Sequence, residues 1–127
     1  MTHRERIIAA LVSPDCYRQM IKPYWKELID LIEMGVDAIN PVQITATGMA
    51  PARLKKEFGK DITFWGGGVS TQGVLDKGSV REIKDEVRRN VDIFAPGGGF
   101  VFTQVHNIQC DVPPENIVAA YKTALEV

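Results

Sequence analysis

The chain has 127 residues, of which 45% are hydrophobic and 24% charged, and its formal net charge is −1. This length suits one domain with a hydrophobic core, and the balanced charge, without a basic run, does not favour nucleic-acid binding. Neither a signal peptide nor an apolar run near the roughly 20 residues that span a bilayer is visible, so we expect a cytoplasmic protein with no membrane or nucleic-acid partner.

Two helices are predicted before the first strand. Thr2 and Glu5 have the spacing of a capping box, which predicts a short helix at the start of the chain. Ser13-Pro14 opens a second helix, whose apolar residues recur at helical spacing up to Gly35, the expected stop. The two cysteines are far apart and outside any CxxC or Cys/His cluster, which is typical of reduced thiols.

The rest of the chain alternates between short apolar runs and helical patterns. We expect strands at 36–40, 62–65 and 100–105, the third being the strongest. Helices are expected at 51–58, from a capping box at Ser79 and Glu82 to Phe94, and from Pro113 to near the C-terminus. Three strand-then-helix units indicate an α/β fold with parallel strands joined by helical crossovers.

Residue types also predict which helix faces are buried. Mixed charges around Arg88-Arg89 are typical of a solvated helix face; the acidic members are Asp85, Glu86 and Asp92. The final helix is expected to bury an apolar stripe made of Ile117, Ala120, Tyr121, Ala124 and Leu125.

Polar and glycine residues follow each predicted strand. They are Asn40 and Gln43, then Gly66, Gly67 and Gly68, then His106 and Asn107. Ligands of parallel α/β folds bind at this end of the strands, so these residues are the candidate substrate-binding residues. Asn40 and Gln43 could orient a polar ligand or bond to their own loop, and the glycine run favours a tight turn with positive φ, with a second role in approaching an anionic group.

His106 is the candidate catalytic residue. Its imidazole can donate to carboxylates, transfer protons or bind a metal near neutral pH, although a histidine at a strand end can equally bond a nearby carbonyl. Cys110 follows four residues later, a spacing compatible with shared metal binding. A third ligand is not apparent, so we assign no metal site.

Three segments in this order resemble the uroporphyrinogen decarboxylase family. Residues 33–43 resemble its sixth-strand region, 65–72 its seventh-strand loop, and 105–117 its eighth strand and closing helix. Residues 2–11 also resemble the family's opening helix. The resemblance implies a truncated domain over 1–127, the C-terminal part of a TIM (β/α)8-type barrel with about three βα units preceded by helices, shortened by two internal deletions.

A complete barrel needs about 250 residues. Parallel strands without closure leave unpaired edges, so we expect a homo-oligomer.

The resemblance implies cofactor-free removal of carboxyl groups from the acetate side chains of a tetrapyrrole, a reaction of porphyrin biosynthesis. In that family a histidine that contacts the substrate aligns with His106.

Two alternatives remain open. The sequence of residues 105–109 resembles more closely the branch related to corrinoid (cobalamin) methyltransferases. In those enzymes zinc activates a thiol, and a cysteine ligand of the zinc aligns with His106. A non-catalytic half-barrel that assembles with itself is the other. The family's arginine-rich N-terminal segment and its His-x-Cys segment are both missing from this chain.

Overall fold

The computed structural model describes residues 24–127, which form parts of two compact units divided after Asp37. The helix expected from Thr2 and the start of the second lie outside the described residues. In the first unit, helix α3 spans Tyr24–Glu33. Gly35 follows it with φ +86°, and its N–H donates to the Ile32 carbonyl, as expected for a glycine that ends a helix.

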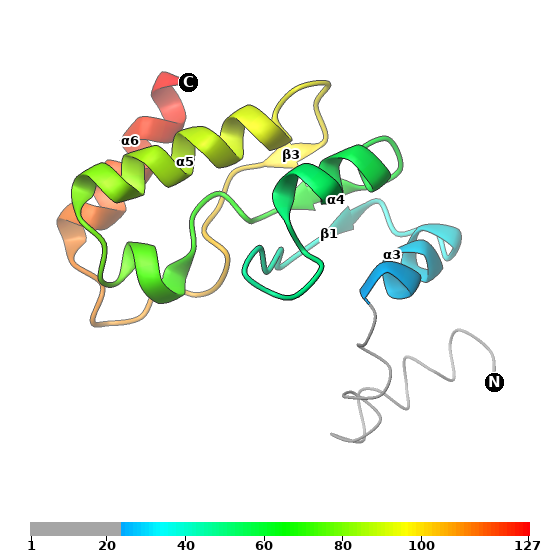
Figure 1. Ribbon diagram of the computed structural model, residues 1–127, viewed down its shortest axis with the longest axis horizontal. Coiled ribbons are helices and arrows are strands. Elements are labelled where there is room, and N and C mark those ends of the chain that lie inside the picture. The colour runs from blue at the N-terminus through cyan, green and yellow to red at the C-terminus, as the bar shows by residue number, and fades with distance from the viewer. Residues whose placement is uncertain (1–23) are drawn as a thin grey trace, which may run out of the picture. The chain divides into compact units, whose positions relative to one another are not determined.

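The second unit alternates strands and helices in the predicted order. Its elements are β1 (Ala38–Ile39), α4 (Pro51–Phe58), β2 (Thr63–Trp65), the π-helical turn η1 (Thr71–Leu75), α5 (Val80–Phe94), β3 (Phe100–Val101) and α6 (Pro114–Glu126). Figure 1 shows this succession along the colour scale. The predicted strands and helices of this unit are all present, and η1 is the element that the sequence pattern did not predict. None of the helices in the described part of the chain is long and apolar enough to cross a membrane.

The strands form an open parallel sheet in the order β1-β2-β3. Ala38 pairs with Thr63, and Trp65 pairs with Val101. The structure therefore combines helices with a small open parallel sheet, which is compatible with the predicted α/β class. This arrangement brings the carboxyl ends of all three strands to one edge of the sheet.

The regular strands are shorter than predicted, and the third is the clearest case. Only Phe100–Val101 of the expected 100–105 is regular strand. The partner strand accounts for part of the difference, because Gly66 and Gly67, with φ of +124° and +78°, leave the extended conformation directly after β2, although the N–H groups of Gly66 and Gly68 still donate to β3 and the chain after it. The chain beyond β3 nevertheless stays beside it, since the N–H of Val105 donates to the carbonyl of Val69 at 2.9 Å.

Helix α5 begins at the predicted capping box. The backbone N–H of Ser79 donates to Glu82 Oε2 at 2.7 Å, and the Glu82 N–H donates to Ser79 Oγ at 3.3 Å. The hydrogen bond from the Ser79 N–H holds the pKa of the Glu82 carboxyl below its ordinary value. Helix α4 begins with Pro51 in its first turn and ends before Gly59, both as predicted.

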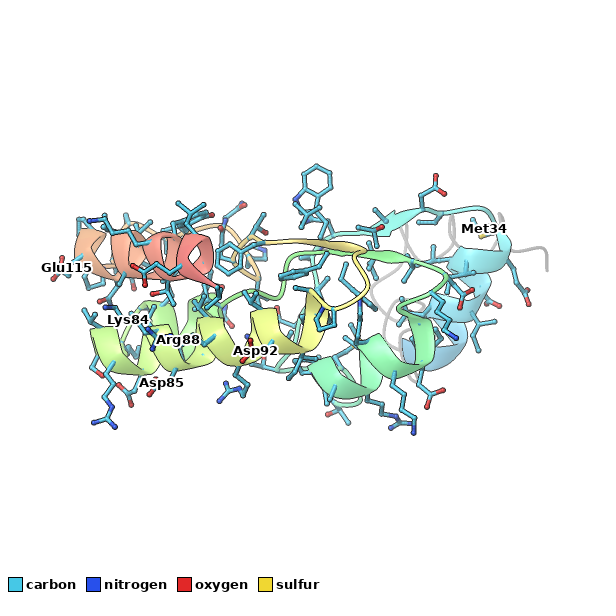
Figure 2. The ribbon with its side chains drawn as sticks, turned by 90° about the horizontal axis from the view of Figure 1, so that it is seen from above. Met34, Lys84, Asp85, Arg88, Asp92 and Glu115 are labelled. Atoms are coloured by element: carbon cyan, nitrogen blue, oxygen red, sulfur yellow. The ribbon has the colours of Figure 1, made fainter. Side chains whose placement is uncertain are left out.

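Helices α4 and α5 lie on the same side of the sheet (Figure 2). Phe64 of β2 is fully buried on that side, where its ring centroid is 5.1 Å from that of Phe94 in α5. The ring of Phe100 stacks on Phe94 at 5.2 Å. Trp65 and Val101 point to the opposite face and are 49% and 41% exposed. The sheet is therefore covered by α4 and α5 on one face, with the alternation expected for strands.

Helix α6 packs along α5 (Figure 1), with a face that only partly matches the predicted stripe: Ala120 is fully buried as predicted, and Ile117 and Ala124 are partly buried against the core. Its buried residues are Asn116, Ala119, Ala120 and Thr123. Tyr121 and Leu125, which were expected in the core, are 39% and 88% exposed, so that prediction was wrong for both. The pattern misled because Asn116 takes a core position, where its amide donates to the carbonyls of Leu75 and Gly78 at 3.0 and 3.1 Å.

The charged face of α5 is solvated as predicted, with one exception. Figure 2 labels Lys84, Asp85, Arg88 and Asp92 on this helix. Asp85 pairs with Arg88 at 3.9 Å on the exposed surface, a pair of small energetic weight. Glu86 is the exception, because it is only 5% exposed and its Oε1 accepts the Ser70 N–H at 2.9 Å. Its burial raises the pKa of the Glu86 carboxyl.

Replacing Glu86 by glutamine is expected to change how stability depends on pH. A carboxyl with a raised folded-state pKa stabilises the fold below its unfolded pKa, and this contribution is lost as the pH rises through the folded pKa. Glutamine does not ionise. The free energy of unfolding of Glu86→Gln relative to the parent chain should therefore increase from about pH 4 to about pH 7, as urea unfolding at both values would measure.

The exposed neighbour Asp85 provides the control for this experiment. Asp85→Asn removes a carboxylate from the same helix, but from its solvated face. Its stability relative to the parent chain should change little between the two pH values. A pH-independent difference for Glu86→Gln as well would show that the buried carboxyl does not titrate differently in the folded chain.

Candidate functional site

A surface groove of about 350 Å³ lies at the carboxyl ends of the three strands. It is lined by Asn40, Pro41, Trp65, Thr103, Gln104, Val105, His106, Asn107 and Tyr121. Asn40 follows β1, Trp65 ends β2, and residues 103–107 follow β3. The groove is therefore where a parallel sheet is expected to hold a ligand.

The structure brings three of the predicted site residues to this groove. Asn40, His106 and Asn107 line it, whereas Gln43 and the glycine run do not. The Gln43 amide donates to Thr45 Oγ1 at 2.6 Å, which is a bond within its own loop.

Asn40 joins the ends of two strands. Its Nδ2 donates to the backbone carbonyl of Trp65 at 2.8 Å. The bond therefore reaches a neighbouring strand rather than the loop of Asn40 itself. By linking the end of β1 to the end of β2, Asn40 fixes one part of the groove wall while its own side chain stays exposed.

The glycine run is buried beside the groove and acts as a close-packed turn. Gly66 and Gly67 have positive φ, as the turn interpretation requires. The N–H groups of Gly66 and Gly68 donate to the carbonyls of Val101 and Thr103 at 3.1 and 2.9 Å. These two donors are already paired. At Gly68 an added Cβ would also meet the Phe102 ring, so the run permits close approach of neighbouring backbone and side chains.

His106 and Asn107 are exposed side chains on an anchored backbone. Val105, directly before them, is 2% exposed, and its N–H is held by the Val69 carbonyl. After them, the Gln109 amide donates to the Asn107 carbonyl at 3.1 Å. The imidazole and carboxamide are therefore exposed to solvent, and their position is determined by the segment after β2 that carries Val69.

A buried polar network lies behind the groove. The Asn90 amide of α5 donates to the Gly68 carbonyl at 3.1 Å, one turn along the helix from the bond between Glu86 and Ser70. Both bonds tie the segment after β2 to α5. Because that segment also carries Val69, the network indirectly supports the position of Val105 and of His106 after it.

Sequence reasoning missed two aromatic residues of the groove. Tyr121 was assigned to the core and Trp65 to a strand, yet both side chains line the groove. The Tyr121 hydroxyl donates to Gln104 Oε1 at 2.6 Å. For Trp65 a signal was available, since a tryptophan at the last position of a strand stands at the edge where ligands bind.

The described groove offers hydrogen-bonding and stacking groups. Imidazole can donate to or exchange protons with a carboxylate, carboxamides can orient a polar ligand, and the two aromatic rings provide flat apolar surface. Within residues 24–127, no three His, Cys, Asp or Glu side chains come together to hold a metal ion. His106 and Cys110 are both exposed, and they do not amount to the three ligands of a catalytic zinc site.

No protein-family model, curated protein or solved structure matches this chain.

Proposed function

We propose that this chain is a shortened uroporphyrinogen decarboxylase-type domain whose groove binds an acetate side chain of a tetrapyrrole and removes its carboxyl group. The supporting observation is that His106, Asn40 and Asn107 line one groove at the carboxyl ends of three parallel strands. In (β/α)8 barrels, active sites lie at this end of the strands.

The arrangement of layers is compatible with a partial barrel of this type. In such a barrel, helices cover the outer face of the sheet and the inner face looks into the barrel. Helices α4 and α5 cover the face that carries Phe64, and Trp65 and Val101 occupy the other. Strands β1 to β3 would then be three neighbouring barrel strands, with α6 as the closing helix.

The proposed reaction needs a group that orients a carboxylate and delivers a proton. The bond between the acetate methylene carbon and the carboxylate breaks, and CO2 leaves. A proton added to the pyrrole ring beforehand makes the ring an electron acceptor, and the electron pair of the broken bond moves into it. A proton added to the methylene carbon, with loss of the ring proton, then gives a methyl group. His106 is the residue that we assign to proton delivery, with Asn40 and Asn107 orienting the carboxylate. The reaction uses no cofactor.

The test is direct turnover of uroporphyrinogen. The purified chain is incubated with anaerobically reduced uroporphyrin, and the products are oxidised and separated by their number of carboxyl groups. We expect porphyrins with fewer than eight carboxyl groups, formed equally by untreated and chelator-treated protein. The absence of product above the level in the protein-free control would reject the proposal. Activity that is lost on chelation would favour metal chemistry instead.

Self-association is a second candidate property, favoured by the open sheet. Within the described residues, β1 and β3 each pair with β2 on one side only. Unpaired edges favour pairing with another chain. We therefore propose that copies associate through these edges, which would extend the sheet and leave the carboxyl-end groove accessible.

The molar mass in solution tests this association. Light scattering coupled to size-exclusion chromatography should give a discrete multiple of 14.1 kDa at micromolar concentration. A well-folded species of 14.1 kDa under these conditions would contradict the association, whatever the outcome of the turnover assay.

A further inference from the structure

Two large aromatic side chains of the groove remain in contact with solvent. Trp65 is 49% exposed and Tyr121 is 39% exposed, although each ring would gain considerable free energy by burial. Trp65 comes from the end of β2 and Tyr121 from the middle of α6, and both line the same groove. Exposed aromatic surface that converges on one groove is typical of a binding site.

Tyr121 is exposed, yet its side chain is held in place. Its hydroxyl donates to Gln104 Oε1 at 2.6 Å. Its ring also packs edge-to-face on Phe102, with centroids 5.5 Å apart and planes at 89°. The ring is therefore preorganised before any ligand arrives, which lowers the entropic cost of stacking a ligand on it.

Trp65 stands on a fixed backbone. The Trp65 carbonyl accepts a hydrogen bond from the Asn40 amide, and Trp65 pairs with Val101 of β3. The next residue, Gly66, donates to the Val101 carbonyl at 3.1 Å. The backbone that carries the indole is thus held from both neighbouring strands.

We propose that Trp65 and Tyr121 are the ring-binding residues of the groove, and that a flat ring bearing a carboxylate stacks against them while His106 and Asn107 bind the carboxylate. Identifying this ring as a pyrrole of a tetrapyrrole rests on the function proposed above. The assignment of the two aromatic residues rests on the groove itself, and it makes Tyr121 a specificity-determining residue that the sequence pattern had placed in the core.

The experiment compares two flat probes on a set of variants. The probes are uroporphyrin, a flat macrocycle with many carboxylates, and pyrenecarboxylate, a flat ring system with one. Dissociation constants are measured from the absorbance or fluorescence of the probe, which does not require Trp65 as the reporter. The variants are Trp65→Leu, Tyr121→Leu and Tyr121→Phe, and the control is Val118→Ala, an exposed residue on α6 outside the groove lining.

We expect each leucine variant to weaken binding of both probes by about tenfold, as for the loss of one stacking partner. Tyr121→Phe keeps the ring but loses the bond to Gln104, and should weaken binding by about two- to fivefold. Val118→Ala should bind as the parent chain does. Because the substituted side chains are exposed, circular dichroism should show the same fold in all variants.

The outcomes separate this inference from the proposed function. Leucine variants that bind both probes within twofold of Val118→Ala would overturn the assignment of Trp65 and Tyr121, even if uroporphyrin binds tightly. Aromatic-dependent binding of pyrenecarboxylate without binding of uroporphyrin would keep the assignment and reject the tetrapyrrole. If the parent chain binds neither probe, both proposals fail.

Discussion

Replacing His106 by alanine is expected to slow the proposed decarboxylation of uroporphyrinogen by about 100- to 10,000-fold, the usual contribution of a positioned acid or base. His106 is the one imidazole among the described residues that line the groove, and the backbone before it is anchored by Val105. The side chain is exposed, so the substitution should leave stability nearly unchanged. Turnover and thermal unfolding measured on the same sample separate the two effects.

A second variant separates orientation of the carboxylate from proton delivery. Glutamine keeps a hydrogen-bond donor at position 106 but cannot carry a transferable proton near neutral pH. His106→Gln should therefore bind substrate within a few-fold of the parent chain while its turnover falls almost as far as that of His106→Ala.

Cys110→Ser is the matched control, because Cys110 is exposed nearby and does not line the groove. It should retain full activity. If His106→Ala were as active as this control, His106 would have no part in the chemistry. If Cys110→Ser alone lost activity, the thiol would have to be considered in place of the imidazole.

The order of elements could be predicted because each boundary has a local cause. The Ser79 capping box, the proline at the start of α4 and the glycine after α3 act within one helical turn, and all three are found where expected. The lengths of the strands depend on partners far along the chain. The third strand is cut short in part by positive φ at Gly66 and Gly67, more than thirty residues earlier in the sequence.

The face of α6 that is buried could not be read from hydrophobicity alone. Asn116 lies inward because the carbonyls of Leu75 and Gly78 are there to receive its amide. Leu75 ends the turn η1, which the pattern did not predict, and Gly78 lies in the loop between η1 and α5. Glu86 is buried for a similar reason, since it accepts the Ser70 N–H. In both cases a polar side chain occupies the core because tertiary structure supplies its hydrogen-bond partner.

The candidate site also contains residues that the sequence could predict and one that it could not. Asn40, His106 and Asn107 could be found because they follow strands, and parallel pairing brings strand ends together. Tyr121 could not, because its place in the groove depends on how α6 packs on α5. That packing exposes the ring and sets the hydroxyl against Gln104.

Replacing Phe94 by alanine is expected to cause a large loss of stability. Phe94 is fully buried at the end of α5, where its ring contacts both Phe64 and Phe100. Truncation of a buried phenylalanine costs about 3–5 kcal/mol, through lost burial and the cavity that remains. Total stabilities of about 5–15 kcal/mol are usual, so the variant should lose a large fraction of its free energy of unfolding.

The same side chain links the core to the groove. An added Cβ at Gly67 would lie 3.4 Å from Phe94 Cε2, so the ring supports the turn that follows β2. Phe94→Leu should cost less than the alanine variant, because much of the volume is retained. Asp92→Ala, on the exposed surface of the same helix, should change stability by about 0.5 kcal/mol or less. Urea unfolding of the three variants gives the order, and an alanine variant at position 94 as stable as Asp92→Ala would show that Phe94 does not pack between β2 and β3.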